Sequence, residues 1–100
     1  MGIGESAREV HVDADRDAAF AAVAAAAGTV GKVLDASPQL GTLVVRTRYG
    51  LQRVKLRVAV IPADPGSRIT INAFADDIWG GGARRGSDKL LRALQEQLLH

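Results

Sequence analysis

Several short runs of the chain alternate between apolar and polar residues, a pattern typical of strands that bury one face of a sheet. Turn-forming residues such as Pro38 and Pro65-Gly66 separate these runs. We therefore expect five strands, with a turn at Tyr49–Gln52 that joins two of them as a hairpin. The predicted strands are Arg8–Val12, Lys32–Ala36, Thr42–Arg48, Arg53–Ile61 and Arg68–Phe74.

Two other segments have the spacing of amphipathic helices. The first follows a run of aspartates, of which Asp15 or Asp17 can cap the helix N-terminus. Gly28 is predicted to follow the end of this helix, with a positive φ. The second helix is predicted over Ser87–Leu99, with Ser87 as its N-cap. The expected core-facing residues are Phe20, Val23, Ala24 and Ala27 in the first helix and Leu90, Leu91, Leu94 and Leu98 in the second.

The resulting order, β-α-β-β-β-β-α, predicts an α+β fold for residues 1–100 as a single domain. We expect a two-layer sandwich, in which an antiparallel meander sheet carries both helices on its apolar face. Hydrophobic residues make up 47% and charged residues 24%, as in a globular rather than a disordered protein. The chain contains no cysteine, which excludes disulfides and thiolate chemistry and fits a cytoplasmic protein. The apolar stretch Ala18–Ala27 is too short to span a bilayer.

Basic residues gather in the predicted hairpin, although the net charge of the whole chain is only +2. With Arg48 opposite Arg53, alternation places the basic side chains on one sheet face and the apolar ones on the other. Like charges that face each other destabilise a sheet, so this face is either a solvated surface or an anion-binding site. The candidate anion-binding residues are Arg46, Arg48, Arg53, Lys55 and Arg57, with Arg84 and Arg85 near the final helix.

The last predicted strand would add Thr70, Asn72 and Phe74 to the same face. Sheet-face RNA readers stack bases on two or three aromatic side chains, and here only Phe74 and Tyr49 could serve. Contacts to phosphates and contacts to an acidic protein therefore both remain open for this face.

The aspartate and glycine clusters do not complete known ligand-binding motifs. Asp13-x-Asp15-x-Asp17 opens like a calcium loop, but the glycine and glutamate that should follow are replaced by Ala18 and Ala24. The segment Gly80–Ser87 lacks the lysine of a Walker phosphate loop. Its free backbone amides could still hold an anion at a helix N-terminus.

The remaining titratable residues do not form a catalytic group. His11 and His100 have no serine or cysteine partner at a recognisable spacing. Asp76 and Asp77 are predicted as loop residues, with capping of a helix as their role. We therefore predict no catalytic residues, no metal site and no cofactor.

Two stretches carry a resemblance to known proteins. The segment Glu9-Val10-His11-Val12-Asp13-Ala14-Asp15, followed by an alanine-rich helix with Phe20, resembles the start of START-like helix-grip proteins, relatives of polyketide cyclases. The segment Ile78–Leu91, a glycine- and arginine-bearing turn before a leucine-rich helix, resembles the end of short bacterial domains of unassigned function. The helix-grip resemblance implies a curved antiparallel sheet wrapped around a C-terminal helix, often with an apolar ligand between them. No catalytic residue is implied.

These observations lead to two hypotheses of function. The first is a non-catalytic domain that binds a small apolar ligand between the sheet and the C-terminal helix. The second is an interaction module that uses the basic sheet face for an anionic partner, either an acidic protein or a nucleic acid. The oligomeric state stays open. The groove residues predicted for the first hypothesis are Phe20, Val45, Leu56, Ile71 and Leu94.

Overall fold

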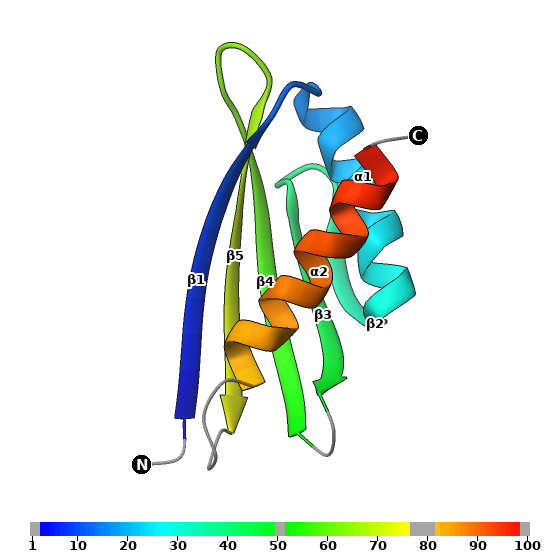
Figure 1. Ribbon diagram of the computed structural model, residues 1–100. Helices are drawn as coiled ribbons and strands as arrows, with labels where there is room; N and C mark the ends of the chain where they lie inside the picture. Colours follow the sequence, from blue (N-terminus) through cyan, green and yellow to red (C-terminus); the bar gives the residue numbers. More distant parts are fainter. Residues whose placement is uncertain (1–2, 50–51, 77–81, 99–100) are drawn as a thin grey trace.

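The computed structural model describes residues 3–49, 52–76 and 82–98 of the chain. Its elements are β1 (Ile3–Val12), α1 (Arg16–Val30), β2 (Gly31–Ser37), β3 (Thr42–Tyr49), β4 (Gln52–Pro62), β5 (Ser67–Asp76) and α2 (Gly82–Leu98). The strands form one sheet in the order β1-β5-β4-β3-β2, and all neighbours are antiparallel. Both helices lie on one face of this sheet (Figure 1). The predicted α+β sandwich and its order of elements are confirmed.

The register of the predicted hairpin is also confirmed. Arg46 lies opposite Lys55, and Arg48 lies opposite Arg53. Alternation along β3 and β4 therefore turns one set of side chains toward the helices, and these are fully buried. The only polar member of that set, Thr47, donates a hydrogen bond of 2.7 Å from its Oγ1 to the carbonyl of Val30. The buried residues are Leu43, Val45, Thr47, Val54, Leu56, Val58 and Val60, and they include all five that were predicted.

The first strand is longer than its apolar pattern predicts. β1 starts at Ile3 rather than Arg8, because it pairs with β5 along its whole length, from Ile3 opposite Asp76 to Val12 opposite Ser67. Asp76 consequently ends β5 and is not a loop residue, whereas Asp77 lies outside the described residues. The first residues of β1 are therefore in a strand because of their pairing with β5, which their side-chain pattern alone does not predict.

Helix α1 begins as predicted and ends later. The Asp15 carboxylate caps it by accepting a hydrogen bond of 2.8 Å from the backbone amide of Ala18. Phe20, Val23 and Ala27 face the core, whereas Ala24 is only partly buried. The prediction for Gly28 was wrong, because Gly28 lies inside the helix and positive φ occurs, among the described residues, only at Gly41 and Gly66.

A close backbone contact occurs at the true end of α1. Gly31 follows the helix directly and starts β2, where it lies against the carbonyl group of Arg46. A Cβ at Gly31 would overlap that carbonyl oxygen. The sequence contains two glycines near the end of this helix, and the one that the fold requires is the one against β3.

Helix α2 begins before the predicted N-cap. Its first residue is Gly82, so the prediction of Ser87 as N-cap was wrong. Ser87 is buried within the helix, and its Oγ donates to the carbonyl of Ala83 at 3.2 Å. Small residues form the face of this first half, and Gly86 lies so close to Val54 that a Cβ would come within 2.7 Å of its Cγ1 atom. The glycines therefore let the helix approach β4 rather than interrupting it.

Two glycines inside helices should respond to alanine in opposite ways. Gly28→Ala should raise the free energy of unfolding by up to about 1 kcal/mol, because nothing lies within 4 Å of the added Cβ and alanine favours helix. Gly86→Ala should lower it by about 1–3 kcal/mol, because the Cβ overpacks against the buried Val54. Urea unfolding of both variants measures the pair, and changes of the same sign would contradict the placement of one glycine.

Leu94 should be a major contributor to stability, because it is 2% exposed in the core between α2 and the sheet. Leu94→Ala should cost about 2–5 kcal/mol of unfolding free energy, as expected for a leucine truncated in a packed core. Leu40→Ala is the matched control, since Leu40 is 75% exposed in the turn after β2. Equal stabilities of the two variants in denaturant titrations would show that α2 is not docked through Leu94.

Candidate ligand site

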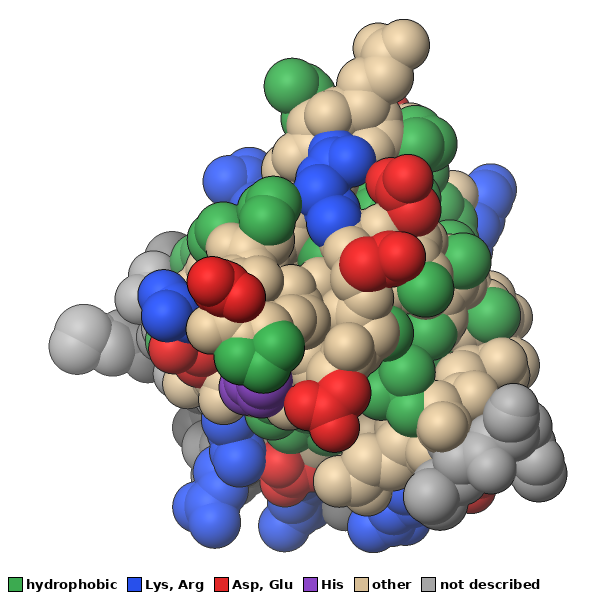
Figure 2. Space-filling view, turned by 90° about the horizontal axis from the view of Figure 1, so that it is seen from above, with side chains coloured by type: hydrophobic (Ala, Val, Ile, Leu, Met, Phe, Trp, Pro, Cys, Tyr) green, Lys and Arg blue, Asp and Glu red, His purple; other side chains and the backbone are tan. Residues whose placement is uncertain are grey.

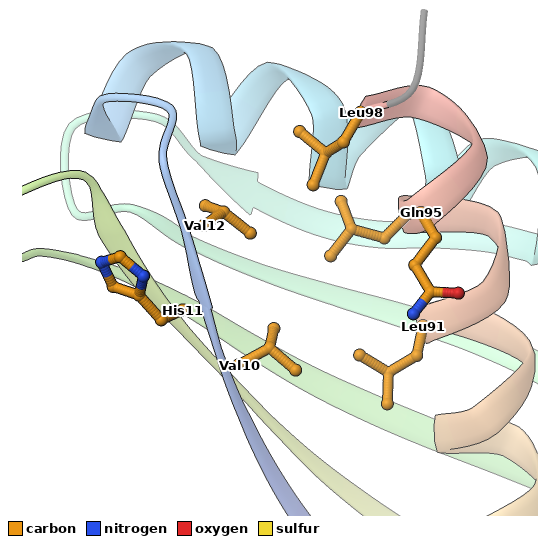
Figure 3. Close-up of a pocket in the computed structure, with 7 residues that line it drawn as sticks. Val10, His11, Val12, Leu91, Gln95 and Leu98 are labelled. Atoms are coloured by element: carbon orange, nitrogen blue, oxygen red, sulfur yellow. The ribbon is translucent and has the colours of Figure 1, made fainter.

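An apolar hollow of about 440 Å³ lies between the second half of β1 and the C-terminal half of α2. Figure 1 shows α2 slanting away from β1 toward its C-terminal end, and the hollow lies in this angle. In Figure 3, Val10 and Val12 point from β1 toward the helix, and Leu91 and Leu98 face them from α2. The hollow is lined by Val10, His11, Val12, Leu91, Leu94, Gln95 and Leu98.

The position of β1 at the edge of the sheet creates the opening. Among the strands that the structure describes, β1 pairs only with β5, so its second side has no neighbour there. The two-residue period of a strand turns Arg8, Val10 and Val12 to the helix side. Arg8 donates a charged hydrogen bond of 2.7 Å to Asp88 of α2. This ion pair joins β1 to the first half of α2, and the valines that follow line the hollow beside the second half.

His11 stabilises the rim of the hollow from the outside. Its ring lies on the opposite side of β1 from Val10 and Val12 (Figure 3). The Nε2 atom lies 2.6 Å from the carbonyl oxygen of Pro65, which can only accept, so the ring donates from Nε2. His11 is exposed, and Figure 2 shows histidine atoms, in purple, beside hydrophobic and acidic side chains. The turn between β4 and β5 is thereby attached to β1.

A second hollow adjoins the first at the connection between β1 and α1. Its volume is about 330 Å³, and it shares His11, Val12 and Leu98 with the first. Asp13 and Ala14 complete its lining. Ser67 fixes this connection, because its buried Oγ donates a hydrogen bond of 2.9 Å to the carbonyl of Ala14. The joint space is apolar in its middle and more polar toward Asp13.

The predicted groove residues lie in the core rather than around an open space. Phe20 is 9% exposed and the other four are 0–2% exposed, so they are packed by their neighbours. Only Leu94 among them lines the hollow described above. Val10, Val12, Leu91 and Leu98 line the hollow, although no ligand role was predicted for them. The leucine stripe on α2 is wider than the part of it that the core buries. This excess of leucines is the feature of the sequence that could have indicated an apolar surface beside the core.

The hollow has a mostly apolar lining, with few polar groups. Its volume lies within the range of about 300–1,000 Å³ that is usual for small-molecule sites. Gln95 offers an amide, and Asp13 offers a carboxylate in the adjoining space. Within the parts of the chain that the structure describes, no three His, Asp or Glu side chains lie close enough together to hold a metal ion.

The basic residues of the hairpin lie on the face of the sheet opposite the helices. Arg46, Arg48, Arg53, Lys55 and Arg57 are all exposed, which confirms their predicted side of the sheet. The predicted neighbours Thr70, Asn72 and Phe74 share this outer face, and the Arg57 guanidinium lies 5.7 Å from the centre of the Phe74 ring. The binding role of these residues stays a prediction.

The described part of the glycine-rich segment belongs to α2 rather than preceding it, and its anion-binding role stays a prediction. Arg84 and Arg85 belong to the first turn of α2, in the helix layer, and therefore do not extend the basic sheet face. Gly80, Gly81 and His100 lie outside the described residues. Neither helix that the structure describes is both long and apolar enough to cross a membrane.

Comparisons with known proteins identify the fold and nothing finer. No family model matches the chain, and no curated protein matches it in sequence. Among solved structures, Ara h 8.0201 superposes with a TM-score of 0.58 at 10% identity, over 98% of this chain and 99% of that one. The KanY protein superposes with a TM-score of 0.55 at 18% identity, over the whole of both chains.

A third similar structure is an Arabidopsis thaliana member of the major latex protein family, with a TM-score of 0.55 at 12% identity. It is matched over 98% of this chain and 96% of that one. All three alignments span nearly the whole chain, so the likeness concerns the complete arrangement of sheet and helices. The protein has the helix-grip fold, an antiparallel sheet around a C-terminal helix, as the resemblance in sequence implied.

The repulsion on the outer face should be measurable. Lys55→Glu should raise the unfolding free energy by about 0.2–1 kcal/mol, because the new carboxylate would lie directly opposite Arg46. In an Arg46→Gln background the same change should have a smaller effect. A double-mutant cycle in denaturant measures the coupling, and a coupling of zero at low salt would contradict the cross-strand repulsion.

Proposed function

We propose that this chain binds a small apolar molecule in the hollow between β1 and α2, and that it does so without catalysing a reaction. The observation that supports this most is the open space itself, lined by valine and leucine side chains from two different elements. Exposed apolar side chains that converge on a concavity mark a ligand site more often than scattered ones do.

The proposal places the ligand at the β1 edge rather than in the middle of the sandwich. The core residues between the sheet and α2 already fill their space, so a ligand there would have to displace them. The hollow needs no such rearrangement. The helix-grip resemblance implies a ligand between sheet and C-terminal helix, and the hollow lies at one border of that interface.

The expected ligand has an apolar body and a small polar end. A molecule that buries about 200 Å² of apolar surface gains about 5 kcal/mol before the costs of association. Since about 5 kcal/mol corresponds to a Kd of about 0.2 mM, binding in the submillimolar to millimolar range is expected. The amide of Gln95 and the carboxylate of Asp13 could each receive a hydroxyl or amine of the ligand.

Leu98→Lys should weaken binding of a neutral, fluorescent naphthalene dye by about tenfold or more, because it places a charge in the apolar lining. Leu40→Lys is the control, since it introduces the same charge at an exposed leucine outside the hollow. Leu98 is itself 39% exposed, so the substitution should leave the fold intact, which circular dichroism can check.

NMR methyl shifts measured during the same titration locate the dye. Shifts confined to Val10, Val12, Leu91 and Leu98 would support the hollow. Shifts concentrated at Val45, Leu56 and Ile71 would instead place the ligand in the core, as the sequence hypothesis has it. No saturable binding by the wild-type chain, or equal binding by the two lysine variants, would rule the hollow out as the binding site.

A further inference from the structure

The outer sheet face carries a strip of positive charge that no helix of the described chain covers. The strip consists of Arg46, Arg48, Arg53, Lys55 and Arg57, and we refer to it as the basic strip. It occupies the neighbouring strands β3 and β4, away from both edges of the sheet. No acidic residue occurs between Gln39 and Pro62, so no carboxylate on these strands neutralises it.

The spacing of the cations suits a chain of phosphates. Residues on one face of a strand repeat about every 7 Å, and adjacent strands lie about 5 Å apart. The basic strip from Arg53 to Arg57 is therefore about 14 Å long, two strands wide, and able to contact about three successive phosphates. Such a grid of like charges must hold counterions in solution, and a polyanion that replaces them gains their release.

The surroundings of the basic strip favour a narrow partner over a broad one. β1 presents Glu9 on the same face, where it pairs with Arg68 at 3.5 Å, and β2 presents Asp35 beside Val44. A bilayer or a globular acidic protein would press against these flanking carboxylates. A single strand laid along β3 and β4 would not reach them. Protein interfaces also have few charged residues at their centre, whereas this patch has its charges there.

Phe74 gives the basic strip a stacking surface. It lies on β5 directly opposite Lys55, half-buried, with the Arg57 guanidinium 5.7 Å from its ring centre. Aromatic side chains next to cations on an open sheet are suited to unpaired bases, which stack without sequence preference. A duplex would instead offer only its phosphates to a flat face.

We propose that the outer face of β3, β4 and β5 binds single-stranded nucleic acid, with phosphates on the basic strip and one base on Phe74. This function is separate from ligand binding in the hollow, which lies on the other face of the sheet. DNA and RNA offer the same phosphates, and the two are distinguished by parallel titrations.

The test is fluorescence anisotropy with labelled, mixed-sequence DNA and RNA oligonucleotides of about 12 nucleotides. Saturable binding is expected at low salt, and three phosphate contacts predict a slope of log K against log salt of about −2. Arg48→Gln with Lys55→Gln should weaken binding by at least about tenfold and reduce the slope to about −1. Phe74→Leu should weaken it by at least about fivefold without changing the slope.

The control is Arg92→Glu, which lowers the net charge by the same two units at an exposed position on α2. It should change affinity by less than about twofold, a size typical of a general charge effect. Equal losses of affinity in the Arg48/Lys55 double variant and in the Arg92→Glu control would overturn the proposal. So would the absence of oligonucleotide binding, or tighter binding to polyglutamate or to phosphatidylserine vesicles than to the oligonucleotides.

Discussion

The fold depends on the side-chain parity of the central strand β4. Its inward residues Val54, Leu56 and Val58 contact the helix layer, and its outward residues carry charge. A slip of one residue would exchange the two sets and bury three cations in the core. The position of α2, the depth of the core and the exposure of the basic strip all follow from this register. The hollow depends on this register indirectly, because the packing of α2 on β4 places its C-terminal half at a distance from β1.

The parts that sequence predicts well are those with strong local alternation. In Val45–Arg48 of β3 and Arg53–Val58 of β4, basic residues alternate with residues that are buried. The two faces and the register could therefore be predicted from the sequence alone. The capping role of Asp15 and the burial of Leu90 and Leu94 were also accessible, because carboxylates at helix starts and leucines at helical spacing have few alternatives.

The parts that it misses are decided by contacts between distant residues. At the end of α1 the fold requires glycine at Gly31 rather than Gly28, because the carbonyl of Arg46, fifteen residues further along the chain, leaves no room for a Cβ there. In the sequence Gly86 suggests an interruption of the helix. Its role becomes clear only from the fold, because a Cβ there would collide with Val54 of β4. The hollow is harder still, since Val10 and Leu98 lie at opposite ends of the sequence and neither differs from an ordinary core residue. A cavity depends on the angle between elements that are distant in the sequence, here β1 and α2. The residue types within each element do not determine that angle.

The gradient of side-chain size along α2 makes this helix a wedge. Glycine, alanine and serine face the sheet in its first half, and leucines do so in its second half. The thick end therefore stands further from β1 than the thin end, with the Arg8–Asp88 ion pair near the pivot. Small rotations about that pivot would change the width of the hollow while leaving the contact of Gly86 with β4 almost unmoved. The helix is therefore held close to β4 at its glycine end and stands clear of β1 at its leucine end.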